Sequence, residues 1–347
     1  MGKRSTNFAS VKAINKFCKQ GNSIGVIQAV YEVDKELDPP EGLKVLLHAL
    51  EIGEAEVKLV VLDVLSQTKY FDMEMVPEIC PCLRDEDAEV RATSAELLGT
   101  LKAKSAIEDL ELLLMDEDYY VRKNAAMALA SVGDINSCNS ILMLLDSENW
   151  KDRYTAVDAL GILASPEWLP SLVDALADPH PKVRENTILS LGNYQAADVV
   201  EAILPLLNDN APSVQAAAIY MLGNFQYPGA IYHLLDFLKS DSEDLLLLAL
   251  EALAKIQDPS TIELLFDLLN HQFPEVQIAA EDALSGFPLP LLLPYFMKTF
   301  TKDPKLLYIE KRLKKSDKQH LFSFKNENED IPSWFVTLLE SLSAKLD

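Results

Sequence analysis

The chain has 347 residues, 49% of them apolar, and a formal net charge of −23. Residues 21–297 hold 16 Lys or Arg against 46 Asp or Glu, an acidic balance that would repel phosphate backbones and so disfavours nucleic-acid binding. No run of about 18 uncharged apolar residues occurs, which argues against a membrane span. We expect protein partners of basic or mixed charge, although the acidic surface could equally serve only solubility.

Residues 1–40 are predicted to form an N-terminal helical cap. They begin with the basic, amphipathic stretch MGKRSTNFASVKAINKF, which lacks the apolar core of a secretory signal. The helical pattern stops at Asp38-Pro39-Pro40. With four cysteines and no disulfide spacing pattern, we expect a cytoplasmic, reducing location.

Residues 41–287 are built from a repeated apolar signature. Seven segments align without gaps at a period of 31 residues: VRATSAELLG, VRKNAAMALA, DRYTAVDALG, VRENTILSLG, VQAAAIYMLG, LLLALEALAK and VQIAAEDALS. A period in this range is typical of a stacked repeat array, in which no unit buries its apolar face alone. The fold class predicted is all-α, a right-handed α-solenoid of about eight two-helix repeats.

Each repeat is predicted to contain a helix A, a polar turn and a helix B. Helix B should begin at an N-cap residue such as Asp87, Asp118, Asn149 or Ser242, or with a proline at its first position. Two columns of helix B should form the core: the small residues Ser94, Ala125, Ala156, Thr187, Ala218, Ala249 and Ala280, and the leucines Leu98, Leu129, Leu160, Leu191, Leu222, Leu253 and Leu284. Gly99, Gly161, Gly192 and Gly223 follow, where we expect glycine to relieve strain or end the helix.

After Pro288 the period is lost. A basic amphipathic segment, PKLLYIEKRLKKSDK, and a final segment, WFVTLLESLSAKL, predict a C-terminal helical cap and tail over residues 288–347. Either the repeat surface or this basic helix could meet a partner.

The pattern D-x(5)-V-R-x(2)-A-x(3)-L-G resembles the HEAT-like repeats of the phycobilisome-lyase type over roughly residues 40–290. The resemblance implies the solenoid fold, but it is weak for function because this repeat serves scaffolds, lyase subunits and a few enzymes. Its aspartate–arginine pair is matched by Asp85 with Arg91, Asp116 with Arg122, and Asp178 with Arg184.

The arginine column, Arg91, Arg122, Arg153 and Arg184, has two interpretations. It could be a row of anion-binding guanidiniums. The favoured interpretation is structural: each arginine pairs with a turn aspartate of its own or a neighbouring repeat, because the acids recur with the same period.

In HEAT-like arrays the B helices line the concave surface, so two helix B columns should face that groove. They predict a partner-binding patch in the middle repeats, flanked by the arginine column. Its residues are Met127, Tyr154, Leu189, Tyr220, Asn124 and Asn186, with Arg122, Arg153 and Arg184. Exposed apolar and aromatic residues of this kind are typical of partner sites. The alternative is that a tighter superhelix buries some of them between repeats.

The sequence contains no recognisable catalytic or metal-binding motif, and we predict no cofactor. None of the five histidines is followed by Glu, and no HExxH, P-loop or GxSxG occurs. We predict a non-catalytic protein-binding scaffold or adaptor. The alternatives are a subunit of a bilin lyase or isomerase acting on phycobiliproteins, and a nucleic-acid-binding HEAT array, which the acidic charge disfavours.

Overall fold

The computed structural model describes residues 11–36, 39–67, 72–240 and 242–299, together with residues 333, 336, 337 and 340. All the regular secondary structure in this part of the chain is helical. The chain divides into two compact units, Met1–Asn193 and Tyr194–Asp347. Most of the predicted C-terminal cap, including its basic helix, lies outside the described residues.

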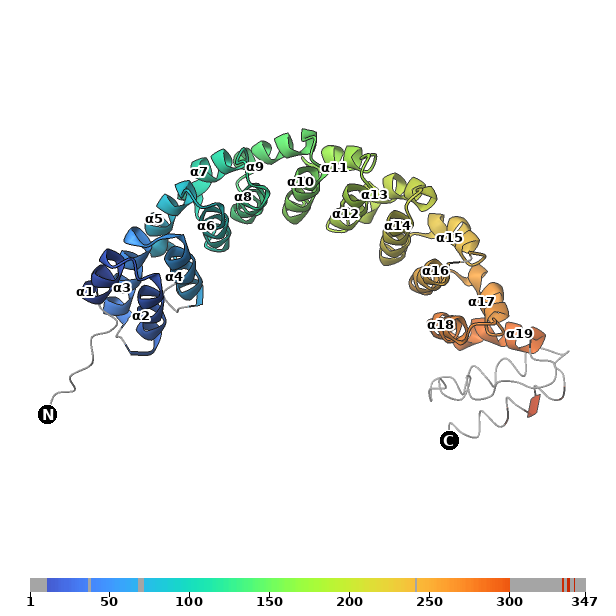
Figure 1. Ribbon diagram of the computed structural model, residues 1–347. Coiled ribbons are helices and arrows are strands. Elements are labelled where there is room, and N and C mark those ends of the chain that lie inside the picture. The colour runs from blue at the N-terminus through green and yellow to red at the C-terminus, as the bar shows by residue number, and fades with distance from the viewer. Residues whose placement is uncertain are drawn as a thin grey trace. The chain divides into compact units, whose positions relative to one another are not determined.

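Two layers of helices build each unit (Figure 1). The B helices form one layer: α4 (Ala55–Gln67), α6 (Ala88–Thr100), α8 (Tyr119–Val132), α10 (Trp150–Leu163) and α12 (Pro181–Leu191) in the first unit, and α14 (Pro212–Asn224), α16 (Glu243–Ile256) and α18 (Pro274–Ser285) in the second. The A helices form the other layer: α3 (Pro39–Ile52), α5 (Val76–Ile79), α7 (Ile107–Leu113), α9 (Ile135–Leu142) and α11 (Leu169–Ala175), then α13 (Ala196–Ile203), α15 (Ile231–Phe237) and α17 (Ile262–Leu268). The predicted all-α solenoid of two-helix repeats is therefore confirmed.

Additional helices flank the repeats. Helices α1 (Val11–Lys19) and α2 (Ser23–Glu36) precede α3, and α19 (Leu289–Thr299) packs against α17. The short 3₁₀ helices are η1 (Met73–Met75), η2 (Cys80–Arg84), η3 (Lys104–Ala106), η4 (Met143–Asp146), η5 (Leu204–Asn208), η6 (Pro228–Ala230) and η7 (Pro259–Thr261). None of the described helices is both long enough and apolar enough to cross a bilayer.

The A helices are shorter than their apolar pattern suggests. In the repeat that contains Cys82, helix A is α-helical only up to Ile79, and the chain then continues as the 3₁₀ helix η2. Pro81 lacks the N–H that would continue the α-helical hydrogen bonds, and Pro205 has the same position in η5. Cys80 and Cys82 therefore lie on a 3₁₀ helix.

The helix B starts follow their local chemistry. The side chains of Asp87, Asp118, Asn149 and Ser242 each accept a hydrogen bond from a backbone N–H of the first turn. Prolines stand at the start of α12, α14 and α18. The predicted N-terminal boundaries of helix B are confirmed at these positions.

The small-residue and leucine columns form the core. All fourteen of their residues are 0% exposed. Successive B helices pack side by side, α6 on α8, α8 on α10 and α10 on α12 in the first unit, and α14 on α16 and α16 on α18 in the second. The leucines fill the space that the small residues leave between neighbouring helices.

The glycines that follow the leucines serve packing rather than termination. Gly99 and Gly161 lie inside their helices. A Cβ at Gly99 would lie 2.7 Å from the Cα of Ala128, and one at Gly161 would lie 2.6 Å from the Cβ of Ser190. Neither glycine ends its helix. Both avoid the steric strain that a Cβ would cause, because the next B helix approaches closely at these positions. Gly192, by contrast, is the C-cap of α12.

Leu160→Ala should lower the free energy of unfolding by about 2–5 kcal/mol, because it leaves a cavity where the fully buried side chain was. Chemical denaturation monitored by circular dichroism measures the change. Ile162→Ala is the matched control on the same helix, since Ile162 is 51% exposed, and it should change stability by less than about 0.5 kcal/mol. Equal effects of the two substitutions would contradict the register of the core.

Candidate functional site

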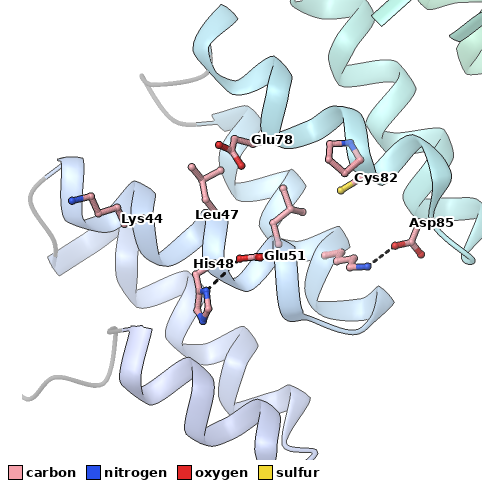
Figure 2. A pocket seen from close by; sticks show the side chains of 10 residues that line it. Lys44, Leu47, His48, Glu51, Glu78, Cys82 and Asp85 are labelled. Carbon is pink, nitrogen blue, oxygen red and sulfur yellow. Dashed lines mark hydrogen bonds and ion pairs between the residues drawn. The ribbon is translucent and has the colours of Figure 1, made fainter. Parts of the chain in front are cut away.

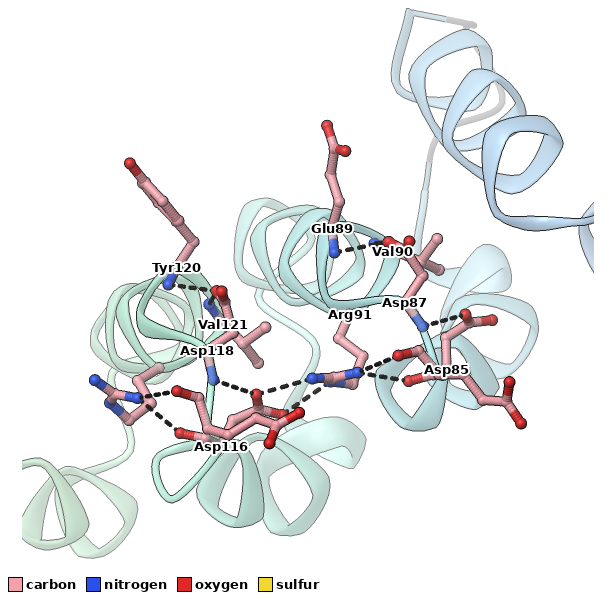
Figure 3. Close-up of polar contacts among 12 residues, drawn as sticks. Asp85, Asp87, Glu89, Val90, Arg91, Asp116, Asp118, Tyr120 and Val121 are labelled. Carbon is pink, nitrogen blue, oxygen red and sulfur yellow. Dashed lines mark hydrogen bonds and ion pairs between the residues drawn. The ribbon is translucent and has the colours of Figure 1, made fainter.

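The arginine column forms a ladder between successive repeats. Arg91 donates from Nε and Nη2 to the carboxylate of Asp116, at 2.8 and 2.9 Å. Its Nη1 donates to the backbone carbonyls of Asp85 and Glu86 in the turn of its own repeat (Figure 3). Asp116 also accepts a hydrogen bond from the backbone N–H of Asp118. One guanidinium thus joins the turn of its own repeat to the turn of the next.

The next two arginines repeat this arrangement with one change. Arg153 pairs with Asp178 at 2.6 and 2.9 Å. Arg122 pairs instead with Asp152, at 3.0 and 3.1 Å, because Ser147 occupies the turn position where other repeats have an aspartate. The Ser147 hydroxyl donates to the same carboxylate. Sequence analysis did not predict that Asp152 would pair with Arg122. The signal that could have indicated it is Ser147 at the turn position, with Asp152 as a nearby carboxylate.

The ladder ends differ from its middle. Upstream, Lys58 takes the place of arginine and its Nζ lies 2.5 Å from Asp85 Oδ2. Downstream, Arg184 donates from Nη1 to the backbone carbonyl of Asp178. In the second unit Gln215 and Gln277 donate to the same type of turn carbonyl, those of Asp209 and His271.

Ladder aspartates have shifted pKa values. Burial alone would raise the pKa of Asp116, but hydrogen bonds from Arg91 and from the Asp118 amide outweigh it and hold that pKa below its ordinary value. Burial would also raise the pKa values of Asp85 and Asp178. Lys58 beside Asp85 and Arg153 beside Asp178 outweigh it, so both pKa values are lowered. The guanidiniums of Arg91, Arg122 and Arg153 already donate hydrogen bonds within the protein. They therefore have no pair of N–H groups free to bind an external anion.

Asp116→Asn should destabilise the protein by on the order of 3–5 kcal/mol at neutral pH, because Arg91 would keep a buried charge without its counter-charge. The folded pKa of Asp116 lies below the unfolded value of about 3.9, so the stabilisation is fully present above that pH and is lost as pH falls through the folded pKa. The stability difference between wild type and variant should therefore shrink below about pH 4. Denaturation across this range measures it, with the exposed neighbour variant Glu117→Gln as control; a difference independent of pH would contradict the assignment.

The predicted patch residues of the first unit lie on the B-helix layer. On α10 the outward stripe is Lys151, Tyr154, Asp158 and Ile162. Met127 on α8 and Leu189 on α12 occupy the repeat position of Asp158. Leu189 is 43% exposed, and Met127 and Tyr154 are half-buried. We call the surface of Met127, Tyr154, Asp158, Ile162 and Leu189 the B-helix patch.

The two predicted asparagines support this patch from below. Asn124 donates its side-chain amide to the carbonyl of Ala92 at 2.9 Å, and Asn186 donates to that of Tyr154 at 3.2 Å. Asn186 is buried. Both amides join neighbouring B helices, which differs from the partner contact expected of them.

Aromatic side chains continue the patch along the starts of the B helices. Trp150 stacks on His180 with ring centroids 4.1 Å apart and also meets Tyr154 edge-on. Lys151 lies over the ring of Tyr119. His180 is also the N-cap of α12, where its Nδ1 accepts a hydrogen bond from the backbone N–H of Lys182.

Tyr220 belongs to α14 of the second unit. Its ring is 43% exposed, and the ammonium of Lys255 lies 5.1 Å from the ring centroid. It stays a candidate contact of that unit.

A cavity of about 510 Å³ lies on the A-helix side of the first unit (Figure 2). Its polar lining is largely engaged: Lys58 pairs with Asp85, and His48 bonds the side chain of Asn15. Burial raises the pKa of Cys82, the thiol in its wall, which makes that thiol unreactive. No group of three metal-ligating side chains occurs among residues that the structure describes.

The two-helix repeats and the arginine–aspartate ladder are features of HEAT-repeat proteins. The HEAT-repeat family model matches residues 76–161, 140–211, 169–249 and 233–308, and the chain belongs to this family. No curated protein matches the sequence significantly.

Three solved structures illustrate what this chain is similar to. One is from the structure of Kap95p with RanGDP, 13% identical over 97% of this chain and 51% of that chain, with a TM-score of 0.58. Another is YibA of E. coli, 19% identical over 74% of this chain and 94% of that chain, with a TM-score of 0.51. A third is from the complex of CpcE and CpcF of phycocyanin lyase from Nostoc sp. PCC7120, 23% identical over 67% of this chain and 92% of that chain, with a TM-score of 0.39. The first two likenesses, with TM-scores above 0.5, show the fold alone.

Proposed function

We propose that this HEAT-repeat chain is a protein-binding scaffold and that the B-helix patch of its first unit contacts the partner. The observation that carries the proposal is the outward row of side chains on α8, α10 and α12, in which Met127, Tyr154, Ile162 and Leu189 are apolar or aromatic and half-buried or exposed. Partner sites of proteins combine these features, with Tyr, Trp and Met as frequent anchors.

Preorganisation supplies the mechanism. The side chains beneath the patch are held by the leucine core, by the Asn186 amide and by the Arg153–Asp178 pair. A surface held in this way orders few residues when a partner arrives, so little conformational entropy is lost on binding.

The charge of the chain supports a basic or mixed-charge partner. The body of the protein is strongly acidic, and complementary charge speeds encounter and excludes acidic competitors. One structure of similar fold is that of Kap95p bound to RanGDP. The cytoplasmic location expected from the sequence stays a prediction.

Tyr154→Ala combined with Leu189→Ala should reduce partner capture by about tenfold or more, because each removes apolar contact area at the centre of the patch. Affinity capture from the source cells, quantified by mass spectrometry, measures the loss. The matched control is Leu112→Ala with Met115→Ala, two substitutions of exposed apolar residues, 68% and 72% exposed, on the A-helix side. Both doubles should unfold at nearly the wild-type temperature.

A photo-crosslinking residue in place of Met127 should cross-link to the captured protein, and one in place of Met115 should not. Unchanged capture by the Tyr154/Leu189 double variant would refute the proposed site. An absorbance spectrum of the eluate adds a second test, because a bilin colour would favour the lyase function over the scaffold.

A further inference from the structure

Asp158 lies in the middle of the B-helix patch. It follows Tyr154 by one helical turn on α10 and precedes Ile162 by another. Met127 and Leu189 hold the same repeat position on the two B helices that pack against α10. A single carboxylate is therefore surrounded on four sides by apolar or aromatic side chains.

Unlike the ladder aspartates, this carboxylate has no direct partner. Within the described part of the chain, Asp158 accepts no hydrogen bond and no cation lies within 4 Å of its oxygens, although the side chain is half-buried. Asp152, six residues earlier on the same helix, is buried but bonded to Arg122 and Ser147. Neither oxygen of Asp158 is completely buried, so water solvates the carboxylate in the free protein and a donor from a partner can reach it.

The electrostatics agree with this geometry. Burial raises the pKa of Asp158, and the charge of Lys123 lowers it by less. Lys123 thus acts on Asp158 only at a distance. Burial raises the pKa of the neighbouring Tyr154, Asp158 and Glu185 raise it further, and Lys182 lowers it. The surroundings of the patch therefore carry both signs of charge.

We propose that Asp158 binds an arginine side chain of the partner protein, while apolar residues beside that arginine contact Tyr154, Met127 and Leu189. This inference rests on the proposed function. A guanidinium supplies two parallel hydrogen bonds to a carboxylate and can also lie against an aromatic ring, which a lysine ammonium does less well. The chain itself already places cations over tyrosine faces, Lys151 over Tyr119 and Lys255 over Tyr220.

Other occupants fit less well. An anionic ligand would be repelled by the negative charge of Asp158. A metal ion needs several oxygen or nitrogen ligands, and the flanking Met127, Tyr154, Ile162 and Leu189 offer no second carboxylate or imidazole. An apolar partner segment alone would bury the carboxylate without compensating it.

A displayed library of random 12-residue peptides, selected on the wild-type full-length chain, tests the proposal. Selected peptides should carry an arginine flanked by apolar residues. Asp158→Asn keeps the side-chain shape and removes the charge, and it should weaken their binding by about tenfold or more. Glu96→Gln is the matched control, because Glu96 has the same repeat position on α6 but is exposed; it should change binding less than about twofold.

Replacing the peptide arginine by norleucine completes a double-mutant cycle. The arginine should strengthen binding to the wild-type chain and contribute little to binding of the Asp158→Asn variant, which lacks the charge that the guanidinium pairs with.

Three results would overturn the role of Asp158: selected peptides that lack arginine, peptides that bind Asp158→Asn as well as wild type, or an equal loss of binding with Glu96→Gln. If those peptides still lose binding to the Tyr154/Leu189 double variant, the scaffold proposal survives. Peptides indifferent to that double variant, or a failure to select any, would overturn both.

Discussion

The close contact between successive B helices is the constraint on which the rest of this structure depends. Because a HEAT repeat cannot bury its apolar face alone, each helix B packs directly against the next within its unit. The small-residue column and the glycines Gly99 and Gly161 permit that approach, and the leucine column fills the layer between. With this contact fixed, the remaining side chains of each helix B either reach the ladder or point outward.

The arginine–aspartate ladder fixes the stacking register of successive repeats more than it adds to the net stability of the fold. A buried ion pair recovers through its hydrogen bonds much of the free energy lost when its charges leave water, so it adds little beyond that. A shifted repeat, however, would leave both charges buried and unpaired. We infer that the bidentate pairs of Arg91 and Arg153 select the one stacking in which each of their turn aspartates meets the arginine of the preceding repeat. These bonds engage the guanidiniums of Arg91, Arg122 and Arg153 within the protein.

Much of the fold could be predicted from the sequence, since a 31-residue period, N-caps such as Asp118 and the leucine column are local or periodic signals. What could not be predicted depends on contacts between repeats. The sequence favoured pairing of each arginine with a turn aspartate of its own or a neighbouring repeat, but only the stacking shows that Arg91 pairs with the aspartate 25 residues later. The same holds for Asn186, whose position in the pattern looked exposed although its amide reaches Tyr154 in the helix before it. The outward position of Asp158 followed from periodicity, whereas its lack of a partner required the surrounding side chains.

In one repeat Asp152 takes the role that a turn aspartate has in its neighbours. This shows that the boundary of the sequence repeat and the boundary of the hydrogen-bonded unit are different. The sequence repeat ends where the period ends, but the bonded unit runs from each arginine to a carboxylate in the following repeat, 25 residues on for Arg91 and 30 for Arg122. A repeat moved elsewhere in the array would carry its arginine away and leave that arginine's carboxylate behind. The smallest exchangeable module of this chain is therefore a pair of neighbouring repeats, and insertion or loss of repeats in its evolution is expected to conserve such pairs.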